Sequence, residues 1–304
     1  MADELNVVTG AFGFTGRYIT SHLLEQGKQV RTLTNHAEHS NAFADKVEAI
    51  PLNFDDADAL AGSLEGAAVL FNTYWIRFPW HGITFERAVA NTRTLIEAAK
   101  RAGVPRLVHI SITNASEDSP LRYFLGKGIV ERAISSSGIS HAIVRPALIF
   151  GSGDILINNI AWLLRKFPFF AIPGAGDYRL QPVFAEDLAR IAVEAAAQSG
   201  DLAIDAVGPE VFRFNELVDL IARIVGSRAR IVHVSPQLAL FLASLVGRIT
   251  HDMTLTRDEI RGLMADLLVS DSQPTAPTRL SEWLHANRAS VGTSYASELG
   301  RRSR

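Results

Sequence analysis

The sequence predicts an α/β fold in which a doubly wound parallel sheet is followed by a smaller, mainly helical C-terminal lobe. Three observations lead to this prediction. Short apolar runs alternate with helical patterns over the first 150 residues, as they do in βαβ units. Three glycines, each three residues from the next, separate the first apolar run from the first helical pattern. Beyond Gly151 the alternation loosens and helical patterns dominate.

The expected elements of the first half follow one another in a regular order. Strands are predicted at 4–9, 28–34, 47–52, 67–73, 106–112 and 141–149. Helices are predicted between them at 14–26, 39–45, 57–64, 83–102 and 120–137. The helix over 83–102 has the clearest amphipathic period, and Pro105 ends it and leads into the next strand.

The second half is less regular, and its organisation is predicted from shorter stretches. Residues 154–170 resemble a helix, "AIPGAGDYRLQP" a loop, "AEDLARIAVEAAA" a helix and "LAIDAV" a returning strand. We therefore assign residues 1–150 to a sheet domain, to which 183–210 return. Residues 151–182 and 211–304 form the lobe, and a substrate is expected between the two.

Composition excludes several classes of function. The 304 residues carry a formal net charge of −2, which argues against a nucleic-acid partner. The absence of cysteine excludes thiolate sites, and the pair His36 and His39 lacks a third ligand, so no metal is expected. The longest apolar run, "LALFLASLVG" from Leu238, is interpreted as a lobe helix packed on the core. It is shorter than the roughly 18 residues of a transmembrane segment. With no signal peptide at the N-terminus, these features predict a cytoplasmic protein.

The glycine triplet Gly10, Gly13 and Gly16 predicts a dinucleotide site. It lies where a strand turns into a helix, and each glycine has a physical reason to lack a side chain. The turn needs backbone freedom, phosphate oxygens must approach backbone N–H groups, and the helix must pack tightly on the strand. The N-terminus of the helix adds partial positive charge towards a diphosphate.

Charge near this turn favours NADP(H) over NAD(H). The second strand lacks the terminal carboxylate that would bind the ribose diol of NAD. Arg17 directly follows the third glycine, and Arg31, Asn35 and His36 lie nearby, so a 2′-phosphate can be met by positive charge.

Tyr123 and Lys127 are the candidate catalytic pair. They are four residues apart, so on a helix capped by Ser119 and begun by Pro120 they share one face. A tyrosine, whose ordinary pKa is about 10, can exchange a proton near neutrality when an ammonium stabilises its phenolate. Gly126 and Gly128 weaken this helix, which close approach of a cofactor or a strand would explain, as would fraying.

Together these motifs resemble the short-chain dehydrogenase/reductase superfamily, in its extended and atypical branch. The resemblance rests on the G-x-x-G-x-x-G spacing and on the stretches "NFDDADAL", "VANTRTLIEAAKRAGVPRLVHIS", "YFLGK" and "IVRPALIFG". "QPVFAEDLAR" and the C-terminal stretch are similar to a subgroup that contains the accessory NAD(P)-binding subunit of respiratory complex I and epimerase-like proteins. The resemblance implies a Rossmann-type domain over residues 1–150.

The resemblance also implies roles for single residues. Thr113, with Ser111 as the alternative, would polarise the substrate oxygen, and Asn91 would order a proton-relay water. Asn35 and Asn53 stand where family members often carry arginine and aspartate, respectively. The implied cofactor-binding residues are Gly10, Phe12, Gly13, Phe14, Thr15, Gly16, Arg17, Asn35, Asn53, Phe54, Asn72, Thr73, Tyr74, Lys127 and Pro146.

The leading hypothesis is an NAD(P)-dependent oxidoreductase that acts on a small carbonyl or alcohol substrate. The alternatives are a nucleotide-sugar epimerase or dehydratase, and a non-enzymatic cofactor-binding sensor or accessory subunit. The aromatic loop "NTYWIRFPWHG" is either a substrate wall or lobe packing. The helices 83–102 and 120–137 could form the seam of a homodimer, as in many relatives of the superfamily.

Overall fold

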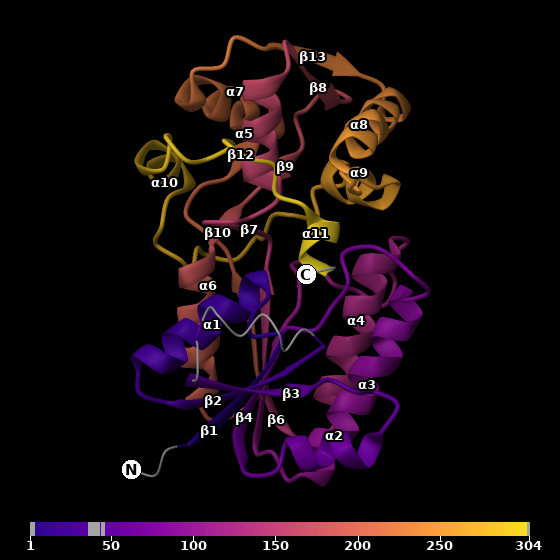
Figure 1. Ribbon diagram of the computed structural model, residues 1–304, viewed down its shortest axis with the longest axis vertical. Coiled ribbons are helices and arrows are strands. Elements are labelled where there is room, and N and C mark those ends of the chain that lie inside the picture. Colours follow the sequence, from indigo (N-terminus) through magenta and orange to yellow (C-terminus); the bar gives the residue numbers. More distant parts are fainter. Residues whose placement is uncertain (1–3, 36–42, 44–45, 303–304) are drawn as a thin grey trace. The chain divides into compact units, whose positions relative to one another are not determined.

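The computed structural model describes residues 4–35, 43 and 46–302 (Figure 1). The chain divides into two compact units. The first comprises Met1–Pro146 and Leu188–Asp205, and the second comprises Ala147–Asp187 and Ala206–Arg304. The helix expected over 39–45, like His36 and His39, lies outside the described residues apart from Phe43.

The first unit is built on a seven-stranded sheet with the order β11-β6-β5-β4-β1-β2-β3. Its strands are β1 (Leu5–Thr9), β2 (Gln29–Thr34), β3 (Val47–Pro51), β4 (Ala67–Asn72), β5 (Arg106–Ile110), β6 (Ser140–Pro146) and β11 (Leu202–Ala206). The pairs β1–β2, β1–β4, β2–β3, β4–β5 and β5–β6 are all parallel. The predicted doubly wound parallel sheet is confirmed, and β1 lies where the strand order reverses.

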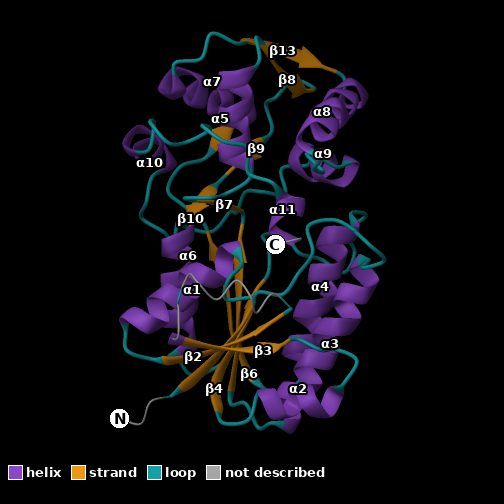
Figure 2. Ribbon diagram, in the orientation of Figure 1, coloured by secondary structure: helices purple, strands orange, loops and turns teal. Residues whose placement is uncertain are grey.

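Helices cover both faces of this sheet (Figure 2). They are α1 (Phe14–Glu25), α2 (Ala57–Ser63), α3 (Phe85–Arg101), α4 (Arg122–Ser135) and α6 (Ala185–Ala196). The helices α2, α3 and α4 lie together on one face, while α1 and α6 lie on the other. Buried aliphatic residues of the strands and of α2, α3 and α4 form one continuous core, with Val7, Leu70 and Leu107 fully buried at its centre.

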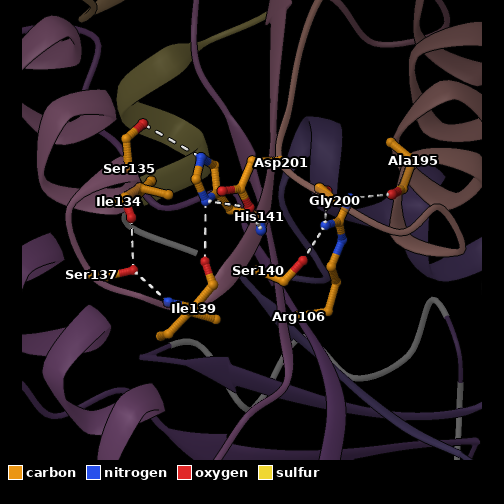
Figure 3. A network of polar contacts seen from close by, with 10 residues as sticks. All are labelled: Arg106, Ile134, Ser135, Ser137, Ile139, Ser140, His141, Ala195, Gly200 and Asp201. Carbon is orange, nitrogen blue, oxygen red and sulfur yellow. Dashed lines mark hydrogen bonds and ion pairs between the residues drawn. The ribbon is translucent and has the colours of Figure 1, made fainter.

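The returning segment is fixed to the sheet by a buried arginine (Figure 3). The Arg106 guanidinium, on β5, donates to the carbonyl oxygens of Ala195 at 2.8 Å and Gly200 at 2.5 Å. The backbone N–H of His141 donates to the Asp201 carboxylate at 3.1 Å. Burial lowers the pKa of Arg106 from its ordinary value. These contacts explain how a segment so distant in sequence completes the first unit.

The second unit is mainly helical, with three two-stranded sheets. Its helices are α5 (Leu156–Lys166), α7 (Phe214–Val225), α8 (Pro236–Thr250), α9 (Arg257–Met264), α10 (Leu280–Ala286) and α11 (Glu298–Arg302). Its strand pairs are β7 (Leu148–Phe150) with β10 (Pro182–Phe184), β8 (Phe169–Pro173) with β13 (Arg230–Val234), and β9 (Arg179–Leu180) with β12 (Phe212–Arg213). Among the described residues, no helix is long and apolar enough to cross a membrane.

The structure differs from the sequence expectations at several places. The stretch 171–182, predicted as a loop, contains the end of β8, all of β9 and the start of β10. The run predicted as a single strand at 141–149 is divided into β6 and β7, which belong to different sheets. The apolar helix from Leu238, which is α8, buries only Ala239 and Gly247, so most of its apolar side chains do not pack on the core.

Candidate functional site

The glycine turn has the geometry that a phosphate-binding turn requires. Gly10 adopts a φ of +70°, in the left-handed region that favours glycine. A Cβ added to Gly13 would lie 3.1 Å from the Gly10 oxygen. At Gly16 it would collide with that oxygen and lie 2.8 Å from the Gly10 carbonyl carbon. The three glycines therefore form a tight cradle that side chains would fill.

The N-terminus of α1 opens beside this cradle. Its N-cap residue is Gly13, which supplies no side-chain cap to the first-turn N–H groups, so these are suited to an anion. Arg17 is half-buried, and its guanidinium lies 5.2 Å and 5.0 Å from the ring centroids of Phe14 and Tyr18. Its charge is thus held in the first turn of α1. Asn35, at the end of β2, is exposed.

A polar network joins the end of β4 to the glycine turn. The Thr73 hydroxyl donates to the Thr9 carbonyl at 2.5 Å, and the Thr73 N–H donates to the Thr9 hydroxyl at 2.8 Å. The fully buried Asn72 accepts from the Thr9 hydroxyl at 3.2 Å and contacts His109 Nδ1 at 3.1 Å. Both strand ends predicted to border the cofactor are thereby fixed to each other.

The residues after β3 and β4 form an aromatic and amide cluster. The rings of Phe54 and Tyr74 lie 4.8 Å apart. Asn91, buried on α3, donates to the Tyr74 hydroxyl at 2.8 Å, and burial raises the pKa of that phenol. Asn53 is exposed and accepts the Asp55 N–H at 3.0 Å. Asn91 is therefore a hydrogen-bonding residue of the interior rather than a solvent-facing one.

Lys127 is deeply buried on α4, with an exposed fraction of 3%. Its ammonium donates to the Ile110 carbonyl, at the end of β5, at 2.7 Å. It also lies 4.8 Å from the centroid of the Trp75 ring. Burial lowers the pKa of Lys127 from 10.5 to about 7. The protein thus holds an amine that titrates near neutrality at the carboxyl end of the sheet.

Tyr123, one turn before Lys127, belongs to the same aromatic cluster. Its half-buried ring lies 6.1 Å from that of Trp75 and 5.9 Å from that of Phe85, both in edge-on arrangements. Trp75 therefore contacts both members of the predicted pair. The helix begins at Arg122 with Leu121 as N-cap, so the predicted cap at Ser119 and start at Pro120 are wrong.

Packing within the first unit explains the two glycines of α4. A Cβ at Gly126 would lie 2.9 Å from the Trp75 ring, so this glycine admits the indole against the helix. A Cβ at Gly128 would lie 2.6 Å from the Glu117 nitrogen and 2.8 Å from the Ser116 Cα. A side chain and a loop approach α4 here, rather than the cofactor or strand that the sequence suggested.

The two hydroxyl candidates differ in their surroundings. The Ser111 hydroxyl donates to Glu131 at 2.5 Å, and the same carboxylate accepts from Arg145 at 2.5 Å. Glu131 and Arg145 line an open pocket of about 560 Å³ beside α4, whose lining includes none of the predicted cofactor residues. Thr113 is fully buried, and its N–H donates to the Pro146 carbonyl at 3.0 Å. The structure therefore ties Ser111 into a salt-bridge network.

Two side chains near the site were missed as functional partners by sequence reasoning. The sequence singles out Trp75 only as one aromatic residue of its loop, and no pattern singles out Glu131. Among the described residues, neither the buried Trp75 Nε1 nor the buried His109 Nε2 has a hydrogen-bond partner. Burial and the charge of Lys127 lower the pKa of His109, which keeps its imidazole neutral. Orphaned buried polar atoms of this kind are typical of a site that receives a ligand.

Comparisons with known proteins agree with this geometry. Residues 10–153 match a family described as NAD(P)H-binding. A curated relative from Arabidopsis thaliana, the mitochondrial NADH dehydrogenase [ubiquinone] 1 alpha subcomplex subunit 9, is 27% identical over 87% of this chain and 71% of its own length. The subunit of the same name from Mus musculus is 29% identical over 88% of this chain and 72% of its own length.

Solved structures show the same fold. A nucleoside-diphosphate-sugar epimerase from Staphylococcus aureus superposes with a TM-score of 0.75 at 19% identity, covering 92% of this chain and 99% of its own. An NADPH-dependent quinone oxidoreductase from Escherichia coli, complexed with NADPH, gives a TM-score of 0.75 at 21% identity with the same coverage.

Residues 10–153 therefore belong to a domain that matches an NAD(P)H-binding family, and the fold is of the Rossmann type. The predicted resemblance to the short-chain dehydrogenase/reductase superfamily, in its extended and atypical branch, is confirmed, as is the similarity to complex I accessory subunits. The expectation of a cytoplasmic protein is wrong by this comparison. The complex I relatives that it matches are named as mitochondrial proteins.

Proposed function

We propose that the chain is an NADP(H)-dependent oxidoreductase that reduces a carbonyl group, with Tyr123 and Lys127 as its acid–base pair. The observation that carries this proposal is the buried ammonium of Lys127 at the end of β5. Burying a lysine is costly, and a pKa moved to about 7 is typical of functional sites. Within the part of the chain that the structure describes, the Trp75 and His109 ring nitrogens beside it lack hydrogen-bond partners, which supports a ligand at the same place.

The residues of the first unit fit a nicotinamide dinucleotide. Gly10, Gly13 and Gly16 provide the cradle, and the first turn of α1 provides N–H groups for the diphosphate. Lys127 would hold the nicotinamide ribose, and Tyr74 with Phe54 would border the cofactor. When bound, the nicotinamide supplies a hydride to the carbonyl carbon.

The protein's own part in the reaction is proton transfer and orientation. The Tyr123 hydroxyl would donate its proton to the carbonyl oxygen, so that the substrate gains a hydride and a proton and becomes an alcohol. Thr113 would orient that oxygen. Ser111, whose hydroxyl donates to Glu131, is the alternative.

The first test is cofactor preference. Arg17 is the described cation nearest the glycine turn in sequence and would meet the 2′-phosphate of NADPH. Titration of the protein with NADPH and NADH should show tighter binding of NADPH, and Arg17→Ala should remove most of that difference. Equal or tighter binding of NADH by the unmodified protein would overturn the preference.

The second test is turnover. Quinones are the carbonyl compounds to try first, because the names of both the curated relatives and one structural neighbour refer to quinone chemistry. Tyr123→Phe should lower the rate of NADPH oxidation by about 10²–10⁴-fold with little change in NADPH affinity. Tyr178→Phe, in the second unit, is the matched control and should leave the rate unchanged.

A second function is favoured by one observation. Trp75 covers both Tyr123 and Lys127, and in this arrangement the indole occupies the space beside the pair. A chain that keeps its cofactor bound without turning it over, as an accessory subunit among protein partners, fits this arrangement. Tight NADPH binding with no oxidation by any quinone or carbonyl, in the protein and in Trp75→Ala alike, would favour it. Interconversion of a nucleotide sugar without net NADPH consumption would instead favour an epimerase.

A further inference from the structure

The helix α8 carries an exposed apolar face. Five of its side chains point outward, with exposed fractions between 36% and 67%: Leu238, Phe241, Leu242, Leu245 and Ile249. At about 100° per residue these five positions fall within roughly 100° of one another around the helix axis. They form one continuous stripe, which we call the α8 face.

The helix α8 is capped at its N-terminus and packed on the side opposite the α8 face. Ser235 caps it by accepting the Leu238 N–H at 3.3 Å, and Pro236 stands in the first turn. On the opposite side Gly247 is buried, and a Cβ there would lie 2.6 Å from the Asp252 carbonyl oxygen. The inner side of α8 is thus packed closely while the outer side is left apolar and open. Single exposed apolar residues are common, but a stripe of five marks an interaction surface.

The sequence stretch that contains the α8 face carries arginines and lacks acidic residues. Residues 227–251 contain three arginines and two histidines, and they contain neither aspartate nor glutamate. Arg230 is exposed on β13, and Arg248 is exposed on α8, about 80° around the helix axis from Leu238.

The first acid after this stretch, Asp252, is turned inward. Its carboxylate accepts from the Tyr295 hydroxyl at 3.0 Å and from the backbone N–H groups of Glu298 and Leu299 at 2.8 and 3.0 Å. Its charge is therefore used within the second unit rather than presented beside the α8 face.

We propose that the α8 face docks on the surface of an anionic lipid bilayer. An apolar stripe bordered by arginine, with no carboxylate in the stretch, is the pattern of a helix that lies in the headgroup layer. Its apolar side chains would enter the acyl boundary while Arg248, at the edge of the stripe, meets a lipid phosphate. A helix of 15 residues is about 22 Å long, which suits lying along a membrane and not crossing one.

The test is flotation of the full-length protein with vesicles. Binding is expected to vesicles of phosphatidylcholine with phosphatidylglycerol, and it should be at least tenfold weaker to phosphatidylcholine alone. It should also weaken when the ionic strength is raised from about 0.1 M to 1 M, as the Debye length shortens. Equal binding to both vesicles, or none to either, would overturn the proposal.

Variants separate the apolar contribution to vesicle binding from the ionic contribution. The double variant Phe241→Ser, Leu245→Ser should bind roughly 10- to 100-fold less well, and Arg248→Glu about tenfold less well. Val211→Ser, an exposed apolar residue outside α8, is the matched control and should bind like the unmodified protein. NADPH affinity and thermal unfolding should be unchanged in all of them, because every substituted side chain is exposed. A dimer that the double variant abolishes, without vesicle binding by the unmodified protein, would assign the face to a second copy instead.

Discussion

Replacing Gly16 by alanine adds a single methyl group, but it should weaken cofactor binding strongly. The added methyl group would collide with the Gly10 oxygen and lie 2.8 Å from its carbonyl carbon. Carbon atoms pack at about 3.5 Å, so the start of α1 must move away from the turn by about 0.7 Å or more. Such overpacking costs roughly 1–3 kcal/mol. The same displacement spoils the hydrogen bonds from the first turn to a diphosphate, whose useful range is only about 0.5 Å wide.

The assay is calorimetric titration with NADPH combined with thermal unfolding. Gly16→Ala should bind NADPH at least about tenfold more weakly, which corresponds to roughly 1.4 kcal/mol. The matched control is Gly62→Ala, in α2, where an added Cβ meets nothing within 4 Å. There alanine should stabilise the fold by about 0.5–1 kcal/mol and leave NADPH binding intact. Unchanged NADPH affinity in Gly16→Ala would refute the assignment of the glycine turn.

Two further predictions concern the interior of the first unit. The pKa of Lys127 is lowered in the folded state, so the unfolded chain binds more protons between about pH 7 and 10.5, and stability must rise with pH there. Denaturant unfolding should show this rise between pH 7 and 9, and Lys127→Met should lose it; an equal slope in both proteins would exclude a buried ammonium. Arg106→Leu should destabilise the protein by about 2–4 kcal/mol, since it strips the Ala195 and Gly200 carbonyls of their donor. Arg101→Ala, at an exposed ion pair, should cost under about 1 kcal/mol, and a similar loss in both variants would contradict the role of the Arg106 network.

Much of the first unit could be predicted from the sequence because its local patterns agree with its tertiary structure. Apolar runs become buried strands, and α3 follows its amphipathic period from Phe85 to Arg101. The glycine triplet was informative because turn geometry and close packing leave no other residue type. Position in the α/β order then placed Asn72, Thr73 and Lys127 at the carboxyl ends of the strands.

The rest depended on contacts that no local pattern encodes. Gly126 is needed because Trp75, some fifty positions earlier, packs against α4, and Ser111 is held by Glu131 of α4. The strands β9 and β12 are only two residues long, too short for any periodicity to show. For α8 the sequence predicts an apolar helix, which the structure confirms, but the same stripe suits a protein core and a lipid surface equally well. Only its exposure in the folded chain separates these two interpretations.

A crystal structure with NADPH and a carbonyl ligand tests the proposed chemistry most directly. The diphosphate should lie against the backbone at Gly13–Gly16, and Lys127 Nζ should contact the nicotinamide ribose. The Tyr123 hydroxyl should come within about 3.2 Å of the carbonyl oxygen of the ligand. The carbonyl carbon of the ligand should lie about 3.5 Å from the reactive carbon of the nicotinamide ring. The catalytic assignment would be contradicted if the dinucleotide were bound at the glycine turn while the Tyr123 hydroxyl lay beyond hydrogen-bond reach of the ligand oxygen, with Trp75 between the hydroxyl and the ligand.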